Sequence, residues 1–262
     1  MIGQKLKSQL SKYNSIYAPS RKQLDLASLD FDVEMFRSTS KLIFSAQNDG
    51  NSIANTNINK ERFFLENGLI LKKIIENNPN ISQVIYLSSG GIYKDSKNLL
   101  NEDSKLKSLE ESSLYFQAKL MTESLMKDFS SKMNICVMRL FTVYGKNLRS
   151  QRLFPILQRK IENGETIEIS MDGGDILRPI NVEDVVQNIQ YILQNEISGT
   201  YNIAGPELLS LREIIARISK VTGKQAKITI TEKEPHCIAP DIIKMSKFLK
   251  TPNTRFNGNW QL

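Results

Sequence analysis

Residues 83–89, QVIYLSS, decide the fold class of this sequence. They form a short apolar run that ends in two serines, and a second strong run, NICVMRLF, covers residues 134–141. NSIYAPS (14–20), KLIFSA (41–46) and GTYNIAG (199–205) are further strand candidates, and longer segments with a helical period separate these runs. Strands that alternate with helices predict an α/β fold in which helices cover both faces of a parallel sheet.

The helix pattern is strongest over residues 112–131, where Met121, Leu125 and Phe129 recur every four residues. Downstream patterns predict helices over 153–164, 182–193, 210–222 and near 241–249, with short strands over 166–170 and 226–232. Asn181 is the expected N-cap of the second of these helices. Ser210 and Glu213 form a capping box at the start of the third, which ends at Gly223.

Composition excludes several classes of protein. The chain has 262 residues, of which 40% are hydrophobic and 24% charged, and no apolar run reaches the roughly 18 residues of a membrane span. These values predict a globular protein without a membrane partner. No secretory signal is visible at the start. Cys136 and Cys237 are the only cysteines and fit a reducing compartment, so we expect a cytoplasmic location.

The net charge of +7 raises nucleic acid or an anionic small molecule as a partner. The lysines are spread through helical segments rather than clustered with aromatic residues, which favours a solvated surface and argues against nucleic acid. His236 is the only histidine, so we expect no metal site built by the protein.

Chemistry is suggested by YFQAK, residues 115–119, which places Tyr115 and Lys119 on one face of the best helix. An ammonium one turn away stabilises the anion of a phenol whose pKa is ordinarily near 10. With Ser89 holding a substrate oxygen, the three groups would transfer the proton that accompanies hydride transfer. The alternative is a surface Tyr/Lys pair. Tyr93 and Lys97 repeat the spacing in a polar stretch and serve as an internal control.

Several motifs occur in a suitable order: LSSGGIY (87–93), YFQAK, RLFTVYG (139–145), GGDILRPINVEDVV (173–186) and GTYNIAG. Together they resemble the extended short-chain dehydrogenase/reductases, a family of nucleotide-sugar epimerases, dehydratases and reductases. The resemblance implies a Rossmann-like doubly wound parallel sheet with a smaller C-terminal substrate domain. It assigns residues 1–145 and about 179–205 to the NAD(P)-binding part, and 146–178 with 206–262 to the substrate part. It also allows a homodimer.

The same resemblance assigns roles to individual residues. It implies that Tyr115 is the acid-base group, that Lys119 binds the cofactor ribose and lowers the pKa of Tyr115, and that Ser89 donates to the substrate oxygen. Ser88 is the alternative if the register differs by one. The other implied positions are Ser45, Ala46 and Asn67 along the cofactor, and Arg178 on a substrate diphosphate, where a bidentate guanidinium suits phosphate.

Some positions depart from the family pattern. Dehydratases carry an acidic pair directly after the serine/threonine position, where this chain has Gly90 and Gly91, so sugar dehydration is disfavoured. Thr142 stands where many relatives have asparagine in the substrate site, and Lys146 where proline is common. Arg21, after the strand candidate 14–20, would meet a 2′-phosphate and favour NADP, although NAD-dependent relatives also have basic residues nearby.

The largest departure is at the start, MIGQKLKSQL. The family opens with a strand and a three-glycine turn that holds the cofactor pyrophosphate, and only the third glycine, Gly3, is present here. Met1 is then either an internal methionine, or the chain is a deletion or a degenerate copy. Without the central strand we expect weak dinucleotide binding and low stability of the 262-residue chain.

These observations predict an epimerase or 4-keto reductase that works on a nucleotide-sugar with NAD or NADP. A catalytically silent family member that binds a nucleotide or a protein is the alternative. The shortened glycine turn favours the silent member, and the intact Ser89, Tyr115 and Lys119 set favours the enzyme.

Overall fold

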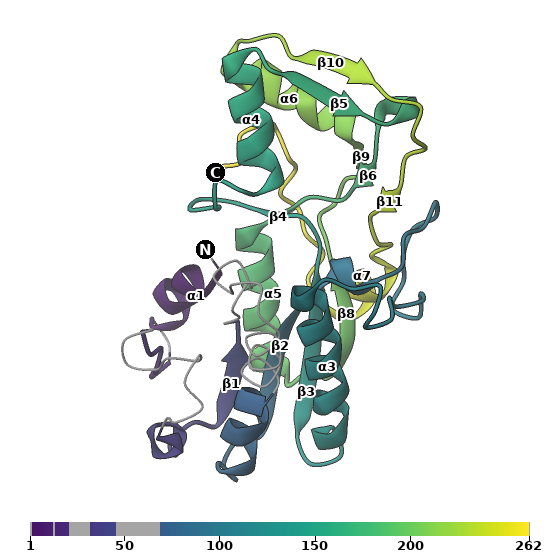
Figure 1. Ribbon diagram of the computed structural model, residues 1–262. Coiled ribbons are helices and arrows are strands. Elements are labelled where there is room, and N and C mark those ends of the chain that lie inside the picture. Colours follow the sequence, from purple (N-terminus) through teal and green to yellow (C-terminus); the bar gives the residue numbers. More distant parts are fainter. Residues whose placement is uncertain (1, 13, 21–31, 46–68, 262) are drawn as a thin grey trace.

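A four-stranded parallel sheet forms the centre of the lower part of the molecule (Figure 1). The computed structural model describes residues 2–12, 14–20, 32–45 and 69–261. Within these ranges the sheet has the order β1-β2-β3-β8. Its strands are β1 (Lys41–Phe44), β2 (Gln83–Ser89), β3 (Asn134–Leu140) and β8 (Gly199–Ile203). All neighbouring pairs are parallel. The predicted α/β class is therefore confirmed.

Helices cover both faces of this sheet because its strands are apolar on both sides. On one face, α1 (Ile2–Leu10), α5 (Val182–Asn195) and α7 (Ile243–Phe248) pack against side chains that include Ile85 and Leu87 of β2. On the other face, helical residues 69–76 and α3 (Leu114–Phe129) pack against Val84 and Tyr86. Successive residues of β2 thus point to opposite faces.

A second core lies in the upper part of the molecule (Figure 1). Helices α4 (Leu153–Asn163) and α6 (Leu211–Thr222) pack on the two-stranded sheet of β5 (Thr166–Ile169) and β10 (Lys227–Ile230). The expected capping box of Ser210 and Glu213 is present, Asn181 caps α5, and Gly223 follows α6 with φ 68°. Short elements join this part to the lower sheet. They are η3 (Met171–Gly173) and the strands β4 (Val143–Tyr144), β6 (Ile176–Leu177), β7 (Ile180–Asn181), β9 (Leu209–Ser210) and β11 (Cys237–Ile238).

The C-terminal region contacts both parts of the molecule. Within residues 206–262, which the sequence analysis assigns to the substrate part, α7 packs against β8, and Met245 and Leu249 join the core of the four-stranded sheet. Their spacing of four gives this short helix an apolar side that covers the sheet. The chain then returns upward, and Phe256 is buried beside Phe154 of α4. The division into two domains otherwise stays a prediction.

Two further expectations fail, one of them only in part. Described residues 14–20 contain no strand, and the 3-10 helix η1 (Val33–Phe36) is the element that precedes β1. On α3 the predicted apolar stripe is partly buried, since Phe129 is buried and Leu125 packs against the core, whereas Met121 is 39% exposed. No helix among the described residues is long and apolar enough to cross a membrane.

Candidate functional site

The carboxyl end of β2 presents two serines with different environments. Ser88 is buried, and its hydroxyl donates to Glu123 Oε1 at 2.5 Å. Ser89 is half-buried at the strand end, and its hydroxyl oxygen accepts a hydrogen bond from the Gly91 amide of η2 (Gly90–Ile92) at 3.2 Å. The geometry therefore favours Ser89 as the serine that meets a substrate, and gives Ser88 a contact inside the fold.

Helix α3 carries the predicted acid-base pair on its first two turns. Tyr115 is half-buried, and Lys119 is buried with its ammonium 5.6 Å from the Tyr115 ring centre. The Lys119 ammonium donates to the Leu87 carbonyl of β2 at 2.5 Å and lies 4.8 Å from the Tyr86 ring centre. Lys119 thus fixes the first turns of α3 against the strand that ends in Ser89.

The charge of Lys119 is unusual for its position. Burial lowers the pKa of the Lys119 ammonium to about 7, and the nearby Glu123 carboxylate opposes that lowering. Lysine ordinarily has a pKa near 10.4, so folding brings the pKa of the Lys119 side chain close to neutral pH. Perturbed groups of this kind are concentrated at functional sites.

Gly90 and Gly91 are required by two aromatic rings. A Cβ at Gly90 would lie 2.3 Å from the Phe141 ring, and one at Gly91 would lie 2.2 Å from the Phe116 ring. Phe141 is buried and stacks on Tyr93 at 6.0 Å, so it has little room to move. A side chain at either of the two positions where dehydratases carry acids would therefore clash with a ring unless that ring moved.

The control pair, Tyr93 and Lys97, is more than a surface pair. Tyr93 is 2% exposed, accepts a hydrogen bond from Arg139 Nη1 at 2.6 Å and donates to Asn202 Oδ1 at 2.8 Å. Lys97 is exposed and pairs with Glu234. The polar stretch around Tyr93 concealed its burial, because its partners come from β3 and β8, which are distant in sequence.

Sequence reasoning also missed the buried ion pair of Glu123 and Arg139. Arg139 Nη2 lies 2.7 Å from Glu123 Oε2, and Nε donates to both carboxylate oxygens at 3.2 Å. The available signal was the spacing of four between Lys119 and Glu123, which puts both on the face of α3 that meets β2.

The expected cofactor residues are only partly described. Gly3 lies at the start of α1, and a Cβ there would be 3.4 Å from the Ser45 hydroxyl at the end of β1. The N-terminus of α1 thus meets the carboxyl end of the sheet, as a dinucleotide site requires. Arg21, Ala46 and Asn67 lie outside the described residues.

Thr142 and Arg178 lie beyond the sheet's carboxyl edge. Thr142 follows β3 with a positive φ of 34°, which is rare for a β-branched residue and typical of asparagine. The Arg178 guanidinium donates to the carbonyls of Gly205 at 2.9 Å, Pro240 at 3.0 Å and Pro206 at 3.4 Å. Three of its five N–H groups therefore hold backbone in this structure.

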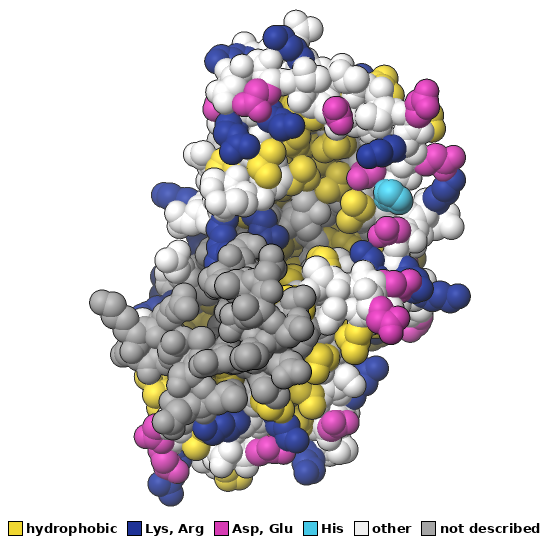
Figure 2. Space-filling view, viewed as in Figure 1, with side chains coloured by type: hydrophobic (Ala, Val, Ile, Leu, Met, Phe, Trp, Pro, Cys, Tyr) yellow, Lys and Arg dark blue, Asp and Glu magenta, His cyan; other side chains and the backbone are white. Residues whose placement is uncertain are grey.

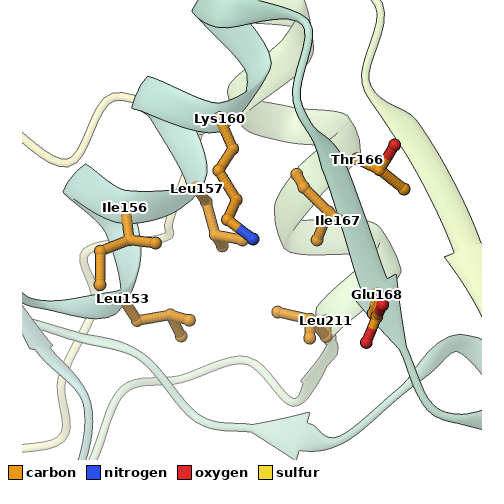
Figure 3. Close-up of a pocket in the computed structure, with 8 residues that line it drawn as sticks. All are labelled: Leu153, Ile156, Leu157, Lys160, Thr166, Ile167, Glu168 and Leu211. Carbon is orange, nitrogen blue, oxygen red and sulfur yellow. The ribbon is translucent and has the colours of Figure 1, made fainter.

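A groove of about 480 Å³ lies in the upper part, between α4 and β5 (Figure 3). Five of its eight lining residues are apolar and the other three are Lys160, Thr166 and Glu168. The Lys160 side chain extends into the space between Leu157 and Ile167 (Figure 3). Figure 2 shows hydrophobic side chains gathered over a hollow between the upper and lower parts, with lysine and arginine side chains near its edge.

Comparisons with known proteins agree with this geometry. The model of a family described as "NAD dependent epimerase/dehydratase family" matches residues 2–204. The chain is 26% identical over 177 residues to the uncharacterized UDP-glucose epimerase YtcB of Bacillus subtilis (strain 168), a match that covers 65% of this chain. The chain spans between 32% and 55% of the length of the curated relatives it matches.

Solved structures show the fold. UDP-glucuronic acid 4-epimerase from Bacillus cereus, in complex with UDP-glucuronic acid and NAD, superposes with a TM-score of 0.73 at 22% identity, covering 98% of this chain and 84% of that one. RMD from Pseudomonas aeruginosa, complexed with NADPH, gives a TM-score of 0.76 at 16% identity, covering 100% and 93%. The predicted Rossmann-like fold is confirmed.

Proposed function

Because the chain belongs to the NAD dependent epimerase/dehydratase family, we propose that it acts on a nucleotide-sugar as an NAD(P)-dependent epimerase or 4-keto reductase. The family is NAD-dependent, which confirms the expected cofactor class. One observation carries the proposal. Lys119 is buried one turn from Tyr115 and bonded to the strand that ends in Ser89, so the three predicted groups lie on adjoining elements.

The residues of this chain would handle the proton of the reaction. The Tyr115 phenolate takes the proton from a sugar hydroxyl, and in the reverse direction the phenol returns it to the carbonyl oxygen. Lys119 lowers the pKa of Tyr115, and the Ser89 hydroxyl holds the reacting oxygen. Bound NAD supplies the hydride chemistry at the carbon that carries this oxygen. Gly3 and Ser45 would lie along this cofactor.

The substrate class rests on charge and on the relatives. Arg178, which follows β6, and Lys160, which borders the groove, are both cations, and one curated relative has a UDP-sugar name and one structural neighbour a UDP-sugar ligand. We place the diphosphate near Arg178, whose two remaining N–H groups suit an oxyanion, and Thr142 near the sugar. The apolar groove beside Lys160 would take a flat part of the nucleotide.

The glycine pair supports epimerisation or reduction over dehydration. Elimination of water needs one group to remove a proton from carbon and another to protonate the leaving hydroxyl. Positions 90 and 91 cannot supply these groups, because Phe141 and Phe116 fill the space that their side chains would need.

The test is product analysis by NMR on the full chain with NAD, using UDP-glucose and UDP-glucuronic acid as probes. An epimerase forms the 4-epimer without net change in NADH. A reductase leaves both probes unchanged and consumes NAD(P)H when a 4-keto nucleotide-sugar is supplied. Binding of NAD or UDP without any turnover would support the catalytically silent member and reject the enzyme.

A further inference from the structure

Consecutive turns of α3 are bonded to consecutive residues of β2. The Lys119 ammonium donates to the Leu87 carbonyl, and the Glu123 carboxylate accepts from the Ser88 hydroxyl. Tyr115, Lys119 and Glu123 are four residues apart, so they lie on one face of the helix. The buried Glu123 carboxylate therefore lies one helical turn beyond the acid-base pair of Tyr115 and Lys119.

Glu123 is held from its other side by Arg139 of β3. The Arg139 guanidinium makes a bidentate contact with the Glu123 carboxylate, and both side chains are 7% exposed. The Arg139 Nη1 group also donates to the Tyr93 hydroxyl and, at 3.1 Å, to the Glu102 carbonyl. A buried ion pair is often no more stabilising than apolar residues of similar volume, so its presence here calls for another role.

We propose that Glu123 is a positioning residue that favours the protonated form of Lys119 beside Tyr115. The proposal rests on the proposed function, because it concerns the same proton-transfer set. Ser88 and Arg139 orient the Glu123 carboxylate, and that carboxylate places a negative charge one helical turn from the Lys119 ammonium. An opposite charge at this range favours the charged form of lysine.

Several groups face Lys119 among the described residues. Tyr115 and Glu123 come from α3, Tyr86 and the Leu87 carbonyl from β2, and Arg139 of β3 lies beyond Glu123. Burial lowers the pKa of Lys119 to about 7, and Glu123 is the group that raises it. Without this carboxylate a smaller fraction of Lys119 would be charged at neutral pH, and the Tyr115 phenolate would be less stabilised.

The test is an NMR titration of the lysine side chains in the full chain with NAD present, with Lys119 assigned by comparison with Lys119→Met. Glu123→Gln keeps the shape and removes the charge, and is expected to lower the pKa of Lys119 by about one unit. Ser88→Ala removes one hydrogen bond that orients the carboxylate but no charge, so the pKa of Lys119 should shift less than in Glu123→Gln. Ser219→Ala, on α6, is the matched control.

An unchanged Lys119 titration in a folded Glu123→Gln protein would overturn the proposal. If that variant does not fold, Glu123→Gln with Arg139→Gln removes both charges together and should shift the pKa in the same direction by less. An unchanged pKa of Lys119 in the double variant would also overturn the proposal.

The titration needs no turnover, so a chain inactive on both probes would reject the proposed function while the role of Glu123 is still tested. If the chain turns over a probe, the alkaline limb of the pH profile of kcat should lie at lower pH in Glu123→Gln than in the wild type.

Discussion

Helices α3 and α6 both pack on strands, but they bury different chemistry. Helix α6 buries Ile214, Ile215 and Ile218, three of the four residues that its sequence pattern indicates, while the fourth, Val221, is 52% exposed. Helix α3 buries Lys119, Thr122 and Glu123 among its apolar side chains. The apolar period therefore identifies most of the buried side of α6, whereas the buried side of α3 includes polar groups that this period does not predict.

Loss of the Tyr115 hydroxyl should have the largest effect of all. Tyr115→Phe removes the proposed acid-base group and should lower kcat by about 10² to 10⁴-fold. The half-buried ring remains, so the melting temperature should stay close to that of the wild type. The comparison is made by steady-state kinetics on whichever probe turns over, and kcat equal to the wild type would reject the assignment.

Tyr93→Phe is the control for that change, because it also removes one phenol hydroxyl. Its partners, Arg139 and Asn202, are buried, so we expect a loss of about 1 to 3 kcal/mol in the free energy of unfolding. Turnover of the folded fraction should be kept. A variant as stable as the wild type would contradict the buried network.

The next effect in size is expected from a substitution that creates a cavity beside α6. Ile218 is fully buried, so Ile218→Ala should lower the free energy of unfolding by about 2 to 5 kcal/mol. Because α6 carries no proposed catalytic group, kcat of the folded protein should not change. Urea unfolding and kinetics on the same preparation measure both quantities, and a selective loss of kcat would break the contrast between the helices.

The buried ammonium on α3 predicts a pH dependence of stability. The pKa of Lys119 is about 7 in the folded chain and 10.5 in an unperturbed one. Between these values the unfolded chain binds the extra proton, so this group makes stability rise with pH, by at most about 1.4 kcal/mol per unit. Below pH 7 both states are protonated and its full cost remains.

Urea unfolding from pH 7 to 10 measures this slope against Lys119→Met. The wild type should gain stability relative to the variant as the pH rises. If the free energies of unfolding of the two proteins changed with pH in parallel, Lys119 would titrate at its ordinary pKa.

The smallest effect is expected at the cap of α6. Ser210 accepts from the Glu213 amide at 3.2 Å, so Ser210→Ala should cost about 1 kcal/mol. Ser113, the N-cap of α3, makes no capping hydrogen bond through its side chain, and Ser113→Ala should cost less. Thermal melts of the two variants compare the helix starts directly, and equal losses would contradict the difference.

The sequence predicted most of what depends on neighbouring residues. The strands at 83–89 and 134–140, the cap at Asn181 and the capping box at Ser210 follow from local patterns, and the structure has them. The failed strand at 14–20 had a suitable composition, but a strand also needs a partner, which composition does not reveal.

Parts of the candidate site could not be predicted, because they depend on long-range contacts. Glu123 meets Arg139 and Ser88 from three different elements, and Arg178 holds carbonyls up to 62 residues away. Nothing near Arg178 in the sequence indicates these backbone contacts. The expected burial of Met121 was wrong for a related reason, since the contacts of Lys119 and Glu123 with β2 help to decide which face of α3 is buried.

The contact between the glycine pair and the two rings constrains how this site can evolve. A side chain at position 90 is tolerated only after Phe141 has become smaller, and one at position 91 only after Phe116 has become smaller or moved aside. Phe116 is half-buried and Phe141 is fully enclosed, so position 91 is the more permissive of the two. At position 90 the smaller residue in place of Phe141 must therefore come first, which leaves a chain with a cavity beside Tyr93, whereas at position 91 Phe116 can also move. The same glycine replacement is harmful while the facing ring is present and acceptable after the ring is lost. The packing thus produces sign epistasis between the two positions.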